Sequence, residues 1–269
     1  MLECRELTFA YEEGTRVLRG LSARFPPGAV TAVIGPNGAG KSTLLRLLLG
    51  VRSPQGGEAL LHGTRTDRIA AGRRATQIAY LSQRPTLAED LSVRGVIRLG
   101  RFARPHETGL VGRVLHECGL VALADRPYAS LSAGQQQRVS LARALAQLQG
   151  PDIAPETQCL LADEPCAAMD PAAVLETVAQ FRAQARTGRA VVLVLHDLSI
   201  AARVADRALV LDARGEAVIE SSVEDALAPG PLRRAFGVPF RILRDARGGE
   251  TALTAVLPVE RIGPRESGA

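Results

Sequence analysis

Hydrophobic and polar residues alternate along the chain in blocks whose period predicts strands and helices. Runs of consecutive apolar residues, several of them β-branched, stand at 30–34 (VTAVI), 159–162 (CLLA) and 190–195 (AVVLVL). Such runs are typical of strands buried on both faces, as in a parallel sheet covered by helices. From Ser42 to Gly50, leucines recur at helical spacing without a helix breaker. The pattern predicts an α/β fold with a parallel-sheet core.

Two further segments have patterns of their own. The stretch LSVRGVIRLGRFARPH at 91–106 is compatible with a helix that Pro105 ends. The stretch FRILRDARGGETALTAVLP at 240–258 consists of two alternating runs around a Gly-Gly pair, which predicts a C-terminal hairpin. The last residues, 261–269, are expected to fray.

Composition places the chain among ordinary globular proteins. It has 269 residues, of which 46% are hydrophobic, and its charges are spread along the whole length. The longest apolar runs are far shorter than the roughly 20 residues of a membrane span. The start, MLECRELTFAYEEG, lacks the apolar region of a signal peptide. We therefore expect a cytosolic protein.

The cysteines and the net charge narrow the chemistry. Cys4, Cys118, Cys159 and Cys166 have neither metal-ligand nor redox spacing, so reduced thiols and no structural metal are expected. The net charge is +5, but the arginines are scattered and only 3% of residues are aromatic, so no nucleic-acid partner is expected. Of the 33 basic residues, only Lys41 is a lysine. A compact ammonium on a flexible stem is therefore required at that position.

Lys41 belongs to a glycine-rich loop between a predicted strand and a predicted helix. The segment fits G-x-x-x-x-G-K-[ST] at every fixed position. Successive backbone N–H groups of such a loop line an anion-binding nest, and the helix N-terminus adds its positive end. Lys41 can reach the β and γ phosphates of a nucleotide, and the next hydroxyl can bind Mg²⁺. The predicted phosphate-binding residues are Gly35, Pro36, Asn37, Gly38, Ala39, Gly40, Lys41, Ser42 and Thr43.

An acidic pair follows the second apolar run. Asp163 emerges at the carboxyl end of the strand, where ligands of open α/β sheets bind, and is assigned to Mg²⁺ through water. Glu164 is predicted to be the general base or water-polarising residue. Pro165 then stops the strand. The alternative is an acidic turn that merely ends a strand.

Polar residues also follow other predicted strands. His196 ends the run at 190–195 and can donate to a γ-phosphate oxygen, and Asp197 can cap the next helix. A structural histidine at the edge of the core is the alternative. Gln83 follows the strand-like run IAYL and has little meaning by itself. LSAGQQQR at 131–138 offers a second anion site, through the Ser132 hydroxyl and the N–H groups around Gly134.

Together, these motifs resemble those of the nucleotide-binding subunits of ATP-binding cassette (ABC) transporters over about residues 1–240. GPNGAGKS resembles the Walker A loop, CLLADE the Walker B strand and LSAGQQQR the signature sequence. Gln83 resembles the Q-loop glutamine, which also contacts Mg²⁺, Asp170 the D-loop aspartate and His196 the switch histidine. Tyr11 is similar to the adenine-stacking aromatic, with a packing residue on an edge strand as the alternative. The resemblance implies an ATPase with catalytic residues Glu164, His196 and Gln83.

The same resemblance implies the architecture and the partners. The fold is then a P-loop NTPase with an ABC-type β subdomain, a parallel-sheet core and an inserted helical subdomain at about 84–145. The ATPase domain would span 1–230 and a C-terminal extension 231–269. Two copies would meet head to tail, so that Ser132, Gly134, Gln135 and Asp170 of one copy serve the ATP held by the other. Two permease subunits would contact the insert and the Gln83 loop at the cytoplasmic face of the cell membrane. A substrate-binding protein would act through that permease.

The chain departs from the family pattern at a few positions. Ala133 replaces a common glycine, and Ala162, Cys166 and Met169 are unusual in the Walker B and D-loop stretch. None removes a charged or Mg²⁺-binding group, so ATPase activity is expected.

The cargo depends on weaker signals. LGRFARPH and HDLSIAARVADR resemble importers of iron chelates, haem and cobalamin, and the polar loop GPDIAPETQ at 150–158 resembles an insertion of haem importers. The loop is equally compatible with a neutral surface insertion. Haem import is therefore the first expectation, and siderophore or cobalamin import the alternative. A non-transport ABC ATPase acting on DNA or ribosomes is a distant alternative, because the single cassette has no heptad run.

Overall fold

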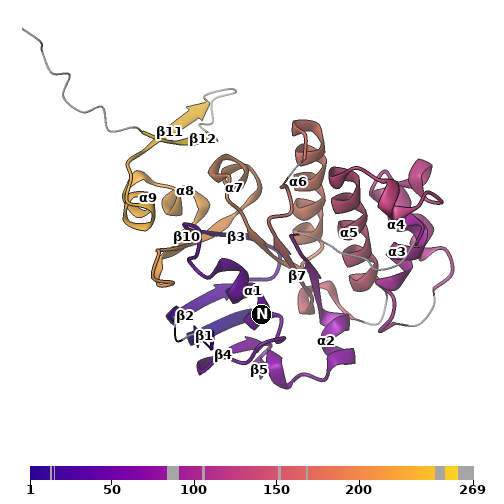
Figure 1. Cartoon of the computed structure of the whole chain (residues 1–269), viewed down its shortest axis with the longest axis horizontal. Coiled ribbons are helices and arrows are strands. Elements are labelled where there is room, and N and C mark those ends of the chain that lie inside the picture. Colours follow the sequence, from indigo (N-terminus) through magenta and orange to yellow (C-terminus); the bar gives the residue numbers. More distant parts are fainter. Residues whose placement is uncertain are drawn as a thin grey trace, which may run out of the picture.

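The computed structural model contains a parallel sheet, an antiparallel sheet and a small hairpin sheet, with helices packed around them (Figure 1). It describes residues 1–12, 14, 16–83, 91–104, 107–150, 153–167, 169–245 and 252–259. Among these residues, no helix is long and apolar enough to cross a membrane.

The larger sheet has six strands in the order β10-β9-β3-β8-β7-β6. All neighbours are parallel except β10, which pairs antiparallel with β9. The expected α/β fold with a parallel core is confirmed. The strands are β3 (Val30–Ile34), β6 (Ile78–Leu81), β7 (Cys159–Asp163), β8 (Ala190–Val194), β9 (Arg207–Leu211) and β10 (Ala217–Ser222).

Strand register brings several loops to one edge of this sheet. Val194 of β8 is level with Val33 of β3 and with Asp163 of β7, and Leu81 of β6 is level with Ala162. Because the strands are parallel, the residues that follow β3, β6, β7 and β8 all leave at the carboxyl edge. The predicted phosphate loop, Gln83, Glu164 and His196 are therefore neighbours.

The second sheet is antiparallel, in the order β2-β1-β4-β5, and packs over α1. Its strands are β1 (Leu2–Ala10), β2 (Arg16–Phe25), β4 (Gly56–Leu61) and β5 (Thr64–Arg65). Leu44 and Leu48 of α1 join a core cluster with Phe25 of this sheet and Val192 of the parallel sheet. The helix that carries Lys41 is thus held between both sheets.

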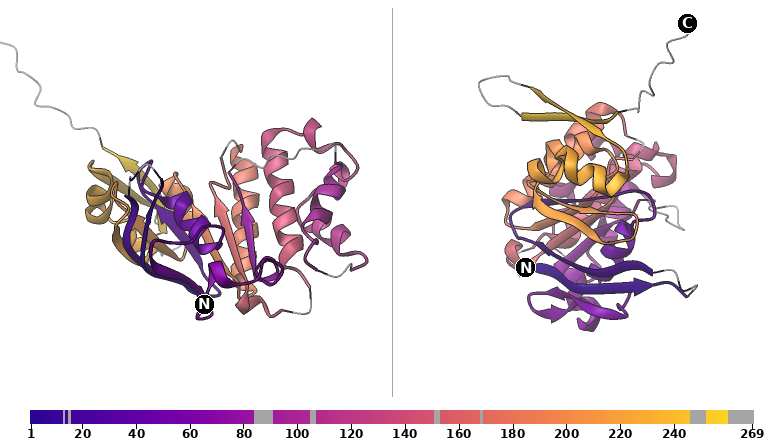
Figure 2. Two further views of the ribbon diagram at one scale, coloured as in Figure 1. Left: turned by 60° about the horizontal axis from the view of Figure 1, so that its bottom comes forward. Right: turned by 90° about the vertical axis from the view of Figure 1, so that its left-hand side faces the viewer.

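Helices cover the parallel sheet and form a separate group at one end of the molecule (Figure 2). The α-helices are α1 (Lys41–Leu48), α2 (Ala71–Gln77), α3 (Val93–Leu99), α4 (Leu110–Glu117), α5 (Ala133–Leu148), α6 (Pro171–Arg186), α7 (Leu198–Val204), α8 (Val223–Ala226) and α9 (Pro229–Phe236). The 3₁₀ turns are η1 (Thr66–Arg68), η2 (Val121–Leu123), η3 (Tyr128–Ser130) and η4 (Pro155–Thr157). α3, α4 and α5 form the helical group, where the insert was predicted.

The first helix of this group ends earlier than the sequence predicts. α3 stops at Leu99 and is capped by Gly100, whereas Pro105 lies outside the described residues. A Cβ at Gly100 would lie 2.2 Å from the carbonyl oxygen of Arg143 on α5. The end of α3 is therefore set by close packing against α5, where only glycine fits.

The C-terminal part forms a hairpin sheet of its own. β11 (Phe240–Asp245) pairs antiparallel with β12 (Ala252–Pro258), in agreement with the expected pair of strands. The frayed tail predicted at 261–269 lies outside the described residues. The division of the chain at residue 230 stays a prediction.

The four cysteines are free thiols. Burial raises the pKa of Cys4, Cys118 and Cys159 to about 12 and that of Cys166 to about 11. All four thiols are therefore protonated and poorly nucleophilic at neutral pH.

A glycine between β9 and β10 positions β2 beside the phosphate loop. Gly215 has φ +75°, and a Cβ there would lie 1.9 Å from the carbonyl oxygen of Val17. We expect Gly215→Ala to lower the free energy of unfolding by about 2 kcal/mol, because it combines backbone strain with a steric clash. Urea denaturation measures this loss. Gly72→Ala is the control, since it meets nothing within 4 Å; equal stability of the two variants would contradict the prediction.

Candidate nucleotide-binding site

The glycine-rich loop lies between the end of β3 and the start of α1. Gly40 has φ +85°, and a Cβ on it would lie 2.8 Å from the carbonyl oxygen of Val17. A Cβ on Gly35 would lie 2.7 Å from the carbonyl oxygen of Leu211. The loop is therefore pressed between β2 and β9 at two glycines that no other residue can replace without movement.

Lys41 begins α1 and is almost completely buried. Its Nζ donates hydrogen bonds to the carbonyl oxygens of Gly35 at 2.8 Å and Pro36 at 2.9 Å. Burial lowers the pKa of Lys41, and the nearby carboxylates of Glu164 and Asp163 oppose that shift. An anionic phosphate would offer this ammonium stronger acceptors than two neutral carbonyls.

A cavity of about 350 Å³ lies over the loop. It is lined by Tyr11, Val17, Asn37, Gly38, Gly40, Lys41, Ser42, Thr43, Glu164 and His196. The size is within the range of small-molecule pockets. The lining unites six of the nine predicted loop residues with Glu164 and His196, which follow β7 and β8. Gly35, Pro36 and Ala39 do not line it.

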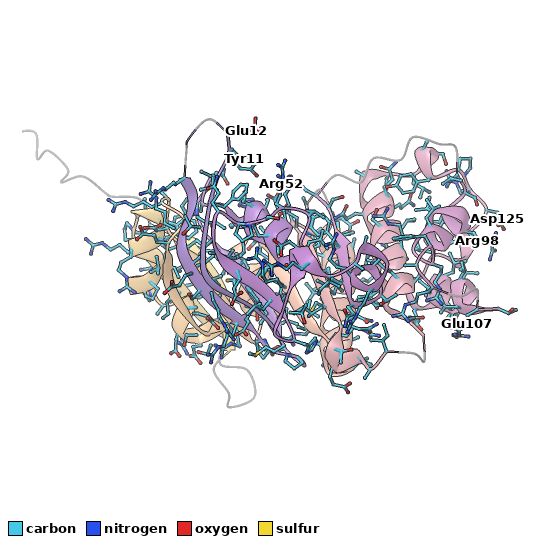
Figure 3. All side chains as sticks on the ribbon, turned by 90° about the horizontal axis from the view of Figure 1, so that it is seen from below. Tyr11, Glu12, Arg52, Arg98, Glu107 and Asp125 are labelled. Carbon is cyan, nitrogen blue, oxygen red and sulfur yellow. The ribbon has the colours of Figure 1, made fainter. Side chains whose placement is uncertain are left out.

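Tyr11 stands at the rim of this cavity, on the same side of the molecule as Arg52 (Figure 3). Its hydroxyl is 3.1 Å from Thr43 Oγ1 and accepts a hydrogen bond from Arg46 at 3.3 Å. The Thr43 bond is the main cause of a lowered Tyr11 pKa. Its ring makes an edge contact with Phe9, with centroids 5.1 Å apart. The ring is thus held in place, and its stacking on adenine stays a prediction.

Asp163 is the last residue of β7 and its side chain is buried. Burial raises its pKa, whereas the Ser42 hydroxyl, Arg46 and Lys41 oppose that rise. Its Oδ1 atom has no hydrogen-bond partner in the structure. A buried carboxylate oxygen without a partner is costly. This donor set of carboxylate and hydroxyl oxygens fits a hard cation such as Mg²⁺.

Glu164 receives two side chains from neighbouring strand ends. Gln83 Nε2 donates to its Oε2 at 2.6 Å, and His196 Nε2 lies 2.5 Å from its Oε1. A carboxylate only accepts, so this contact is a hydrogen bond when His196 carries a proton on Nε2. Glu164 has φ +49°, which is uncommon outside glycine, and its N–H donates to the carbonyl of Val194 at 3.1 Å. Backbone strain of this kind is typical of functional residues.

The signature residues lie away from this cavity. Ser132 caps α5 and forms a capping box with Gln135, at 3.3 Å and 3.1 Å. Neither they nor Gly134 line the described cavity over the loop. Asp170 caps α6 by accepting from Ala173 N at 2.9 Å. Within one chain, the structure leaves these predicted nucleotide ligands apart from the phosphate loop.

Asp197 caps α7, as the sequence predicts. Its Oδ1 accepts from the backbone N–H groups of Ser199 at 2.7 Å and Ile200 at 3.1 Å.

Sequence reasoning missed three residues of the site. Val17 lines the cavity from β2, a strand without a motif. Arg46 binds Tyr11 and opposes the raised pKa of Asp163. Burial, reinforced by Asp163, raises the pKa of Tyr80 to about 12. Arg46 had a usable signal, because it follows Ser42 by four residues and so shares its helix face.

The phosphate loop, the buried Asp163 and the Glu164 cluster define the chain as a P-loop ATPase. The family model described as ABC transporter matches residues 18–167. The hemin import ATP-binding protein HmuV of Pseudomonas aeruginosa is 38% identical, over 90% of this chain and 95% of that protein. The same-named protein of Bordetella pertussis is 36% identical, over 90% and 94%.

A solved structure shares the whole architecture. It is described as an inward-facing conformation of a metal-chelate type ABC transporter, and it matches with a TM-score of 0.79 at 25% identity. The match covers 97% of this chain and 98% of that chain. The chain belongs to the ABC transporter family, and it is an ATP-binding, ATP-hydrolysing subunit of that family.

Proposed function

We propose that this chain energises the import of haem across the cytoplasmic membrane by ATP-driven closure of two copies on a pair of permease subunits. The observation that carries the proposal is the meeting of Gln83, Glu164 and His196 over a phosphate loop. The import and the cargo are supported by the names of the relatives, hemin import ATP-binding proteins.

Hydrolysis is assigned to the residues around Glu164. Ser42, Asp163 and Gln83 would hold Mg²⁺, which neutralises charge on the β and γ phosphates when bound. Lys41 binds the phosphates, and Glu164 accepts a proton from the attacking water. His196 would donate a hydrogen bond from Nε2 to a γ-phosphate oxygen. The unpartnered Oδ1 of Asp163 supports the cation site.

A second copy of the chain would complete each nucleotide site. Ser132 is exposed at the start of α5, where its N-terminal N–H groups can bind an anion. Ser132 does not line the cavity over the phosphate loop of the same chain. A head-to-tail pair, in which each Ser132, Gly134, Gln135 and Asp170 serves the partner's ATP, accounts for this separation. Closing that pair requires ATP in both sites.

The helical insert would receive the permease. Leu99, the last residue of α3, is 45% exposed, and Phe102, just after the helix, is 76% exposed. Arg98, next to Leu99 in the chain, lies with Asp125 at one end of the molecule (Figure 3). Exposed apolar side chains of this size favour a protein contact. We propose that these two side chains contact cytoplasmic helices of the permease. The chain would then bind at the cytoplasmic face of the membrane. A substrate-binding protein would deliver cargo to that permease.

The alternative cargo is another metal chelate, either an iron siderophore or cobalamin. It is favoured by the fold match to a metal-chelate type transporter at 25% identity. The polar loop at 150–158, which supports haem, need not touch cargo.

Transport assays separate these cargoes. The chain is expressed with the permease encoded beside it, the complex is placed in lipid vesicles, and ATP hydrolysis is measured with haem-loaded or iron-chelate-loaded binding protein. We expect stimulation by the haem form, and none in vesicles that contain Glu164→Gln. Stimulation by the iron-chelate form alone would mean that an iron chelate, and not haem, is the cargo. Hydrolysis indifferent to permease and cargo would point to a non-transport ATPase.

A further inference from the structure

The C-terminal hairpin contacts the helix that directly follows His196. β12 lies against α7, and the two are seen next to each other in Figure 1. The backbone N–H of Val256 donates to Ser199 Oγ at 3.3 Å, and the Val256 side chain is 5% exposed within the main core cluster. The hairpin thus has both a polar and an apolar anchor on this side of the fold.

Ser199 joins the hairpin to the cap of α7. Its backbone N–H donates to Asp197 Oδ1 at 2.7 Å, and its hydroxyl accepts from Val256. Asp197 is the residue next to His196. A continuous path of two hydrogen bonds and one peptide bond therefore connects β12 to the residue that contacts Glu164.

α7 needs contacts with the rest of the protein to be stable. It has only seven residues, and so short a helix is not stable by itself. Leu198, Ala201 and Val204 bury one face in the core. On the other side, Ile200 and Arg203 border an open cavity of about 420 Å³. Ser199, whose hydroxyl accepts from Val256 of β12, lines the same cavity, so the hairpin contacts α7 beside it.

The other strand of the hairpin, β11, also contacts the body of the protein. Arg244 of β11 pairs with Glu224 of α8, and Phe240 makes an edge contact with Phe236 of α9 at 5.5 Å. A two-stranded sheet is marginal when alone, and these contacts make it a firm support.

We propose that the β11–β12 hairpin is a positioning element for the switch histidine, acting through Val256, Ser199 and the Asp197 cap. It narrows the positions that His196 can take relative to Glu164 and the γ-phosphate. This inference rests on the proposed catalytic role of His196. Ser199 and Val256 are positioning residues, because neither lines the cavity over the phosphate loop.

The test compares kcat and KM for ATP in the full chain assembled with its permease. Loss of one hydrogen bond predicts that Ser199→Ala lowers kcat about fivefold, the equivalent of about 1 kcal/mol, with KM changed less than twofold. Ser199→Thr keeps the hydroxyl and is expected to restore kcat. Val256→Ala is expected to act like Ser199→Ala, whereas Leu257→Ala, whose side chain is 48% exposed, is the matched control.

A double mutant separates positioning from general destabilisation. If Ser199 acts through His196, then Ser199→Ala causes no further loss in a His196→Ala background. An equal fivefold loss in both backgrounds, or an unchanged kcat in Ser199→Ala, would overturn the inference while leaving the role of His196 intact. Full activity of His196→Ala alone would instead remove the proposed catalytic role, and the inference with it.

Discussion

Glu164→Gln is expected to lower kcat for ATP hydrolysis at least about 100-fold while ATP still binds and assembles a long-lived dimer. Glutamine has nearly the shape of glutamate, so it can still contact Gln83 and His196. One of its two contacting atoms is then an amide NH₂ donor and no longer an acceptor oxygen. It cannot accept a proton from water. It also removes one negative charge near Lys41 and the incoming phosphates. The chemical step therefore fails, but closure on ATP does not.

Gel filtration with ATP and Mg²⁺, run alongside a phosphate-release assay, measures both effects. The parent chain should dimerise only transiently, and Glu164→Gln should elute as a stable dimer. Glu216→Gln, an exposed carboxylate in the turn before β10, is the control for loss of a charge. A Glu164→Gln chain that stays monomeric with ATP and hydrolyses at the parent rate would refute both the base and the ATP-linked pairing.

The central strands and their motifs could be predicted because their signals are local. β3, β7 and β8 are uninterrupted apolar runs, and α1 starts at Lys41, as the motif requires. The cap of α7 at Asp197 follows from the same kind of local rule. Parallel packing then determines that the ends of these strands meet at one edge.

The remaining features depend on packing between distant segments. Val17 lines the site because its backbone lies against Gly40 and Gly215, which are far apart in sequence. The positive φ of Glu164 is maintained by its hydrogen bond to Val194 on another strand. No period or propensity in a single segment contains this information. The separation of Ser132 from the phosphate loop likewise appears only in the folded chain.

Lys41→Arg is expected to weaken ATP binding about 100-fold, or about 2.7 kcal/mol, although it keeps the positive charge. The Lys41 side chain lies in a narrow space, 6% exposed, with Nζ at 2.8 Å and 2.9 Å from two loop carbonyls. A guanidinium is wider and planar, so it would displace the loop or the phosphates that the loop binds. Lys41→Met should lose at least as much affinity, because it removes the charge.

Titration with a fluorescent ATP analogue measures these affinities, and a thermal melt verifies folding. The matched control is the exposed Arg73→Lys, the same exchange in reverse, which should bind ATP like the parent. If Lys41→Arg binds within threefold of the parent, the position requires only charge. If it fails while Arg73→Lys does not, the shape of the ammonium explains why the chain keeps its single lysine here and uses arginine at every other basic position.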